Sequence, residues 1–127
     1  MGAWGVQFTE NDGALDFLGE IGESRDWADV EACLTDFIDS GGYDDADQAF
    51  AASELVAAAL GNPSPHLDAE LAAWAAEHAE RAAAFASKAK QAADLIATSS
   101  ELNELWAETD EYADWQASVD DLERRLG

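Results

Sequence analysis

Positive charge is the scarcest property of this sequence. Its 127 residues include only six lysines and arginines against 28 aspartates and glutamates, which gives a formal net charge of −22 at pH 7. Nucleic acids and anionic lipid surfaces are polyanions and repel such a chain. The deficit therefore argues against direct binding to DNA or RNA and against a membrane-surface role. It favours a basic protein or a cation as the partner.

Cysteine and long apolar runs are also lacking. Cys33 is the single cysteine, which excludes an intramolecular disulfide and a zinc site built from several cysteines. Charged residues interrupt every apolar stretch before it reaches the roughly 20 residues that a transmembrane helix requires. Residues 1–9 lack the basic and apolar regions of a secretion signal. We therefore expect a cytoplasmic protein without a membrane segment.

Material for a hydrophobic core is nevertheless present, since 48% of the residues are apolar and five are tryptophan. Residues 1–65 carry 14 acids and one base, and residues 66–127 carry 14 acids and five bases, so the acidity is not confined to a tail. The length fits a single domain spanning residues 1–127. We expect an all-α fold, a compact bundle of about five or six helices, with an extended and partly docked lead-in over residues 1–8.

The helical expectation rests on apolar residues that recur at intervals of three and four. In the first predicted helix, residues 11–21, the apolar side chains fall on one side and the acids on the opposite side. The same pattern predicts helices over 26–39, 44–60, 64–78 and 79–97, and a long last helix from about residue 98 whose apolar residues recur at intervals of seven.

Particular residues mark the predicted helix ends. Gly41 and Gly61 are typical of helix C-termini, whereas Ser64 and Thr98 are typical N-caps. A break is expected near His78. The predicted core includes Trp27, Phe37, Val56, Leu71, Trp74, Leu105 and Trp115.

The stretch TENDGALDFLGE, residues 9–20, is the part of the chain that most resembles a catalytic or metal-binding cluster. Its acids Glu10, Asp12 and Asp16 lie within seven residues. Thr9 or Asn11 is a suitable N-cap, and Glu10 or Asp12 then lies in the first turn, where the helix dipole favours an anion. Asp16 continues the solvent-facing stripe. We interpret the cluster as the start of a helix rather than as a site.

Glu54 is the second candidate, because it lies in the apolar stretch AFAASELVAAAL. If it is buried, its pKa rises, and it could act as a general acid or as an anchor between helices, with Arg81 or Trp4 as a partner. If it is exposed, it shares a narrow polar stripe with Asp47. We favour the exposed or the anchoring interpretation over catalysis.

Three further residues are assigned no site. Cys33 lies on an apolar helix face, with no basic residue nearby in the sequence to activate it, and is interpreted as a core residue. His66 and Glu70 are four residues apart and could contact one cation, but two ligands are a weak signal. The sequence therefore predicts no cofactor, no metal site and no catalytic residue.

Four stretches together resemble a known family. The stretches MGAWGVQFTENDGALDFL, AASELVAAALGNP, SELNELWAE and WQASVDDLERRL are similar, in order and spacing, to the family called domain of unknown function 4259. The resemblance implies a small, acidic, all-α bacterial protein. It carries no catalytic, cofactor-binding or metal-binding residue over to this chain.

Three hypotheses of function follow, in decreasing order of preference. The first is a non-enzymatic module that binds a basic protein, as an inhibitor, an immunity protein or a nucleic-acid mimic does. The second is a protein whose acids bind divalent cations or adapt it to high salt. The third is an enzyme that uses Asp12, Asp16 and Glu54 around a cleft near Trp4. These four residues are the candidate functional positions, and the oligomeric state is left open.

Overall fold

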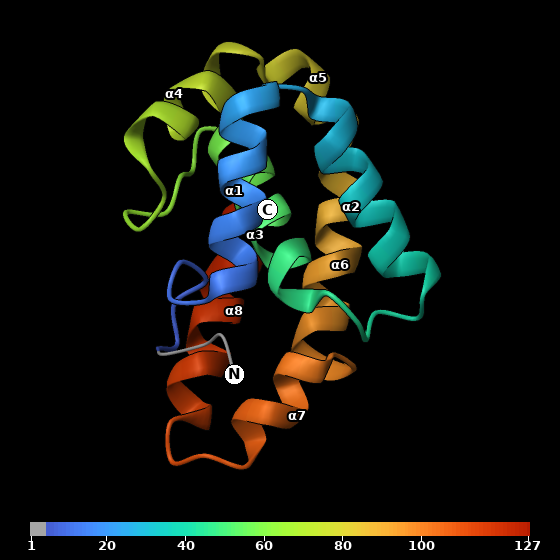
Figure 1. Cartoon of the computed structure of the whole chain (residues 1–127), viewed down its shortest axis with the longest axis vertical. Coiled ribbons are helices and arrows are strands. Elements are labelled where there is room, and N and C mark those ends of the chain that lie inside the picture. Colours follow the sequence, from blue (N-terminus) through green and yellow to red (C-terminus); the bar gives the residue numbers. More distant parts are fainter. Residues whose placement is uncertain (1–4) are drawn as a thin grey trace.

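The computed structural model describes residues 5–127 (Figure 1). Within this range the regular structure is entirely helical, which confirms the all-α prediction. The predicted number of helices, five or six, is slightly too low. Residues 5–127 form eight helical segments: α1 (Asp12–Ser24), α2 (Trp27–Asp39), α3 (Ala46–Ala59), α4 (Ala69–Glu77), the five-residue α5 (Ala79–Ala83), α6 (Ala86–Thr98), α7 (Glu101–Ala107) and α8 (Tyr112–Leu126).

Helix α3 forms the centre of the molecule. Twelve of its 14 residues are buried, and it contacts each of the other seven helices within residues 5–127. Figure 1 shows α3 behind α1, with α4 and α5 at the top of the view and α7 at the bottom. Seven of the buried α3 residues are alanines, whose short side chains let the surrounding helices approach closely. A helix that is apolar nearly all round is expected in this central position.

The first two helices agree closely with the sequence pattern. Helix α1 buries Ala14, Phe17, Leu18 and Ile21, and α2 buries Trp27, Val30, Leu34 and Phe37. Apart from Leu105, the predicted core residues are all buried. No helix in the described range combines the length and apolarity needed to cross a bilayer.

The fourth helix begins later than predicted. The hydroxyl of Ser64 accepts a hydrogen bond from the backbone N–H of His66, which stabilises only a turn. The carboxylate of Asp68 accepts from the N–H groups of Glu70 and Leu71 and is the true N-cap of α4. The expected break near His78 is present, and a second break at Phe85 separates α5 from α6.

The long last helix is two helices. Ser100, rather than Thr98, caps α7, because its hydroxyl accepts from the N–H of Asn103 at 3.0 Å. Helix α7 ends at Ala107, and the hydroxyl of Thr109 then donates to the carbonyl of Trp106 at 2.8 Å and accepts from the N–H of residue 111. The chain therefore turns between α7 and α8. As a result, Leu105 is only half-buried and Trp106 is buried in its place.

Residues 1–4 of the predicted lead-in lie outside the described residues, and residues 5–8 are docked but not extended. Residues 5–10 follow a series of bends and turns. Phe8 is buried, and its ring stacks on that of Phe50 in α3 with 5.8 Å between the ring centroids. The hydroxyl of Ser118 in α8 donates to the carbonyl of Val6 at 3.3 Å. These contacts attach the lead-in to both α3 and α8.

Candidate functional site

The candidate residues near the N-terminus are placed as parts of a helix start. Trp4 lies outside the described residues. The side chain of Asn11 accepts from the N–H of Ala14 at 3.2 Å, so Asn11 is the N-cap and Asp12 lies in the first turn. Asp12 and Asp16 are both exposed on α1. Their geometry agrees with their interpretation as helix-start and solvent-facing acids.

Glu54 is buried, with 1% of its surface exposed, so the interpretation as an exposed stripe residue is wrong. Its two carboxylate oxygens accept from the two terminal nitrogens of Arg125 in α8 at 2.6 and 2.8 Å. The anchoring interpretation is therefore the one that the structure supports. The partner is Arg125 rather than Arg81 or Trp4.

The ion pair belongs to a small network that holds α8 against α3. The Nε of Arg125 donates to Asp121 at 2.8 Å, and a terminal nitrogen of Arg125 donates to the carbonyl of Asn62 at 3.3 Å. The side-chain amide of Asn62 donates in return to the carbonyl of Arg125 at 3.0 Å. Burial raises the pKa of Glu54, and the hydrogen bonds and charge of Arg125 oppose this effect. Both oxygens of Glu54 are engaged in the ion pair with Arg125.

The remaining acids lie at the surface of the molecule. All 28 aspartates and glutamates lie in the described range, and only Glu54 is buried. Lysine and arginine side chains form ion pairs with four of them, namely Glu31, Glu54, Glu70 and Asp121, in residues 5–127. The negative charge on the surface is therefore mostly uncompensated. No group of three histidine, cysteine, aspartate or glutamate side chains is arranged to hold a metal ion in this part of the chain.

An open groove of about 540 Å³ lies between α1 and the segment that leads into α4. One side is formed by α1 and by Arg25, which follows it. The other side includes His66, Asp68 and Glu70, so the two residues considered as a cation pair both line this groove. Sequence reasoning missed the groove, because it depends on how residues 61–68 fold back beside α1. The other residues that line it are Thr9, Leu15, Leu18, Gly19, Gly22 and Leu71.

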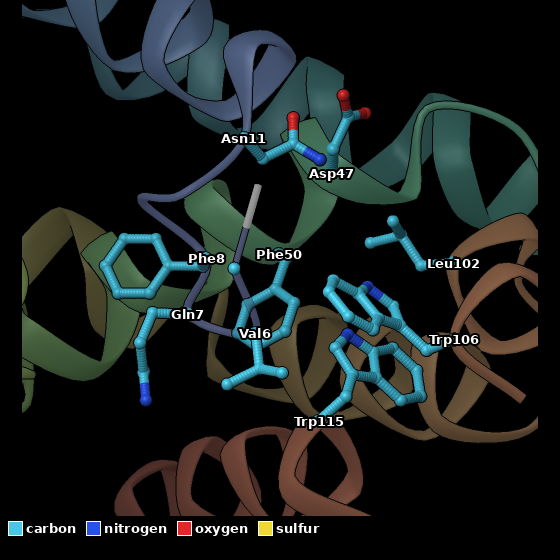
Figure 2. Close-up of a pocket in the computed structure, with 10 residues that line it drawn as sticks. Val6, Gln7, Phe8, Asn11, Asp47, Phe50, Leu102, Trp106 and Trp115 are labelled. Atoms are coloured by element: carbon cyan, nitrogen blue, oxygen red, sulfur yellow. The ribbon is translucent and has the colours of Figure 1, made fainter. Parts of the chain in front are cut away.

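A second cavity, between the lead-in and α3, is much smaller. Its volume is about 10 Å³, which is room for about one water molecule. Figure 2 shows aromatic side chains around it, with Asn11 and Asp47 above them. Phe8, Phe50, Trp106 and Trp115 contribute these rings. This cavity is too small for an organic substrate.

Cys33 is half-buried beside the hydrophobic core. Burial, followed by the negative charges of Asp45, Asp36 and Asp47, raises the pKa of its thiol to about 12. The thiolate, which is the nucleophilic form, is therefore scarce at neutral pH. Cys33 is therefore less buried than its interpretation as a core residue implies, while its raised pKa agrees with an unreactive thiol.

The comparison with protein families gives one match. The model of a domain of unknown function, DUF4259, matches residues 2–118. The chain belongs to the DUF4259 family. Its membership confirms the resemblance found in the sequence. Comparisons with curated proteins and with solved structures give no match.

The DUF4259 match includes all residues that line the groove, as well as Glu54. It ends before Asp121 and Arg125, the two residues of α8 that complete the ion-pair network.

Proposed function

We propose that this member of the DUF4259 family is a non-enzymatic binding module that docks a basic protein in the cytoplasm. Inhibitors, immunity proteins and nucleic-acid mimics act in this manner. The observation that carries the proposal is the uncompensated surface charge: 28 acids, of which one is buried and four form ion pairs with lysine or arginine in the described range.

Complementary charge favours such a partner in two ways. It accelerates diffusional encounter, and it disfavours partners of the same sign. The carboxylates of the free protein repel one another. A bound cationic surface neutralises some of them, and binding therefore stabilises the fold. An interaction of this kind weakens as salt is added, because the Debye length falls from about 30 Å at 0.01 M to about 8 Å at 0.15 M ionic strength.

Affinity capture from the native lysate at low salt tests the proposal. The full chain serves as bait, and bound proteins are released with a sodium chloride gradient and identified by mass spectrometry. We expect proteins with a strongly basic surface, and we expect their release at moderate salt. Capture of proteins without such a surface, with release independent of salt, would refute the proposal.

A matched variant separates charge from structure. Asp16→Asn, Glu20→Gln and Glu23→Gln together remove three exposed charges from α1 and leave its buried face unchanged. We expect this variant to fold normally and to release its partner at lower salt. Calorimetric titration with calcium, magnesium, zinc and manganese addresses the cation-binding alternative, which predicts stoichiometric binding abolished by Asp16→Asn. The enzyme alternative predicts an activity that is lost in the same variant.

A further inference from the structure

Helix α1 has a second stripe, of which only Leu18 belongs to the core. Leu15, Leu18, Gly19 and Gly22 all line the groove, and their spacing of three, four and seven residues places them along one face of the helix. Leu18 is buried, but Leu15 has 42% of its surface exposed, and Gly19 is also exposed. The stripe therefore presents an apolar floor to solvent.

The two glycines keep this floor open. A Cβ atom added at Gly19 or Gly22 would meet nothing within 4 Å, so packing within the fold does not require glycine at either position. Glycine within a helix nevertheless costs about 1 kcal/mol relative to alanine. Glycine at these positions leaves room for another backbone or a ligand to approach α1 closely.

Carboxylates flank the floor on both sides. At about 100° per residue, Asp12, Glu23 and Asp16 follow the stripe on the solvent side of α1, and all three are exposed. Asp68 and Glu70 line the opposite wall. Arg25 is the exception: its guanidinium lies 4.0 Å from Glu70 and links the two walls where α1 ends.

We propose that this groove, the surface between α1 and the start of α4, binds one amphipathic helix of a basic protein. Apolar side chains of the bound helix lie over Leu15, Gly19 and Gly22, and its lysines and arginines face the carboxylates on the two walls. This inference rests on the proposed function and names the surface at which that function occurs.

The lining of the groove favours a cationic helix as its occupant. Leu15, Gly19 and Gly22 form a continuous strip along one face of α1, against which a bound helix can pack its own apolar residues at i, i+3, i+4 and i+7. Packed helices lie 8–10 Å apart, and glycines at the contact favour the shorter separation. The carboxylates on both walls require a cationic rather than an anionic helix.

Binding of two synthetic peptides to the full chain tests the proposal. The first is an 18-residue helix of leucine and lysine with leucine at positions i, i+3, i+4 and i+7. The second has the same composition and charge, with the leucines rearranged so that they share no helix face. Affinities are measured by calorimetry at low salt. We expect the first peptide to bind at least tenfold more tightly than the second.

Two variants locate the site. Gly19→Leu fills the groove without changing charge, and Ala113→Leu adds the same side chain at an exposed position on α8, outside the groove. We expect Gly19→Leu to weaken binding of the amphipathic peptide at least tenfold and Ala113→Leu to leave it unchanged. Leu15→Ser, at an exposed position, should weaken binding too, and it keeps the test decisive should Gly19→Leu fold poorly.

The outcomes distinguish the two proposals. Equal binding of the amphipathic peptide to the parent chain, Gly19→Leu and Leu15→Ser would overturn the groove and leave the basic-partner proposal standing. Equal binding of both peptides would also overturn the groove, because the apolar floor would then contribute nothing. Binding of neither peptide at low salt would overturn both proposals.

Discussion

Three glycines of α1 provide a test of the structure within a single helix. At Gly19 and Gly22 an added Cβ meets open space, whereas at Gly13 it would overlap the carboxylate of Asp47. Alanine is the better helix former by about 1 kcal/mol, partly because it restricts the unfolded chain. We therefore expect Gly19→Ala and Gly22→Ala each to stabilise the protein by about 0.5–1 kcal/mol.

Gly13→Ala should have the opposite effect. Asp47 is half-buried, and its carboxylate accepts a hydrogen bond from the N–H of Gln48 at 2.9 Å. The new methyl group would force this carboxylate out of its place beside the start of α1. Loss of the hydrogen bond that Gln48 donates to this charged group typically costs about 1.5–3 kcal/mol, which the relief of its burial offsets only in part. This loss exceeds the gain in helix propensity, so we expect a net destabilisation of about 1 kcal/mol.

Urea unfolding followed by circular dichroism measures these differences. The double variant Gly13→Ala with Asp47→Ala is the decisive comparison, because removing the carboxylate removes the overlap. We expect Gly13→Ala to be stabilising in the Asp47→Ala background, which gives a coupling free energy of about 1 kcal/mol or more. An equal stabilisation by all three single alanine substitutions would refute the placement of Asp47 against α1.

Four further predictions concern the charged and buried groups. Glu54→Gln should destabilise the protein by about 3 kcal/mol in chemical unfolding, because Arg125 is left without its main partner; replacing both residues by apolar ones should cost less. Cys33 is partly exposed, but its pKa is raised to about 12 by burial and nearby carboxylates, so it should react with a thiol reagent at neutral pH far more slowly than an ordinary cysteine; labelling of the folded protein as fast as that of the unfolded protein would contradict this environment. Burial raises the pKa of Asp47, so its contribution to stability should grow as pH falls from 7 towards the usual carboxyl range. Burial alone would raise the pKa of Asp121, but the hydrogen bonds and charges of Arg125 and Arg124 together lower it, so its contribution should be lost below about pH 4; the melting temperature measured across this range should pass through a maximum. Sodium chloride should raise the melting temperature at pH 7, because it screens the repulsion among the acids; a melting temperature independent of salt would contradict the role given to repulsion.

Local signals in the sequence predicted the parts of the fold that depend on neighbouring residues. Asn11 caps α1 through the N–H of Ala14, three residues away. Gly41 and Gly61 have φ values of 94° and 95°, which L-residues with side chains rarely adopt, and they follow helices that end near the predicted positions. Periodicity likewise identified the buried side of α1 and the central position of α3.

Features that depend on residues far apart were not predictable in this way. Glu54 and Arg125 are 71 positions apart, so nothing near Glu54 in the sequence indicated its partner. Ser64 and Asp68 are both suitable N-caps. Ser64 forms only a turn with His66, and Asp68 caps α4. The groove arises where the segment after α3 returns beside α1, and no periodicity encodes this approach.

The contacts of α3 with all seven other helices have a consequence for hydrogen exchange. Its backbone amides reach solvent only when neighbouring helices separate, so they should exchange at the rate set by global unfolding. Helix α5, five residues long with a single buried side chain, should open and exchange by local fluctuation. This helix, half of whose residues are alanine, the smallest chiral residue, thus reports the stability of the whole molecule, and the slowest amides of the protein should map to residues 49–59.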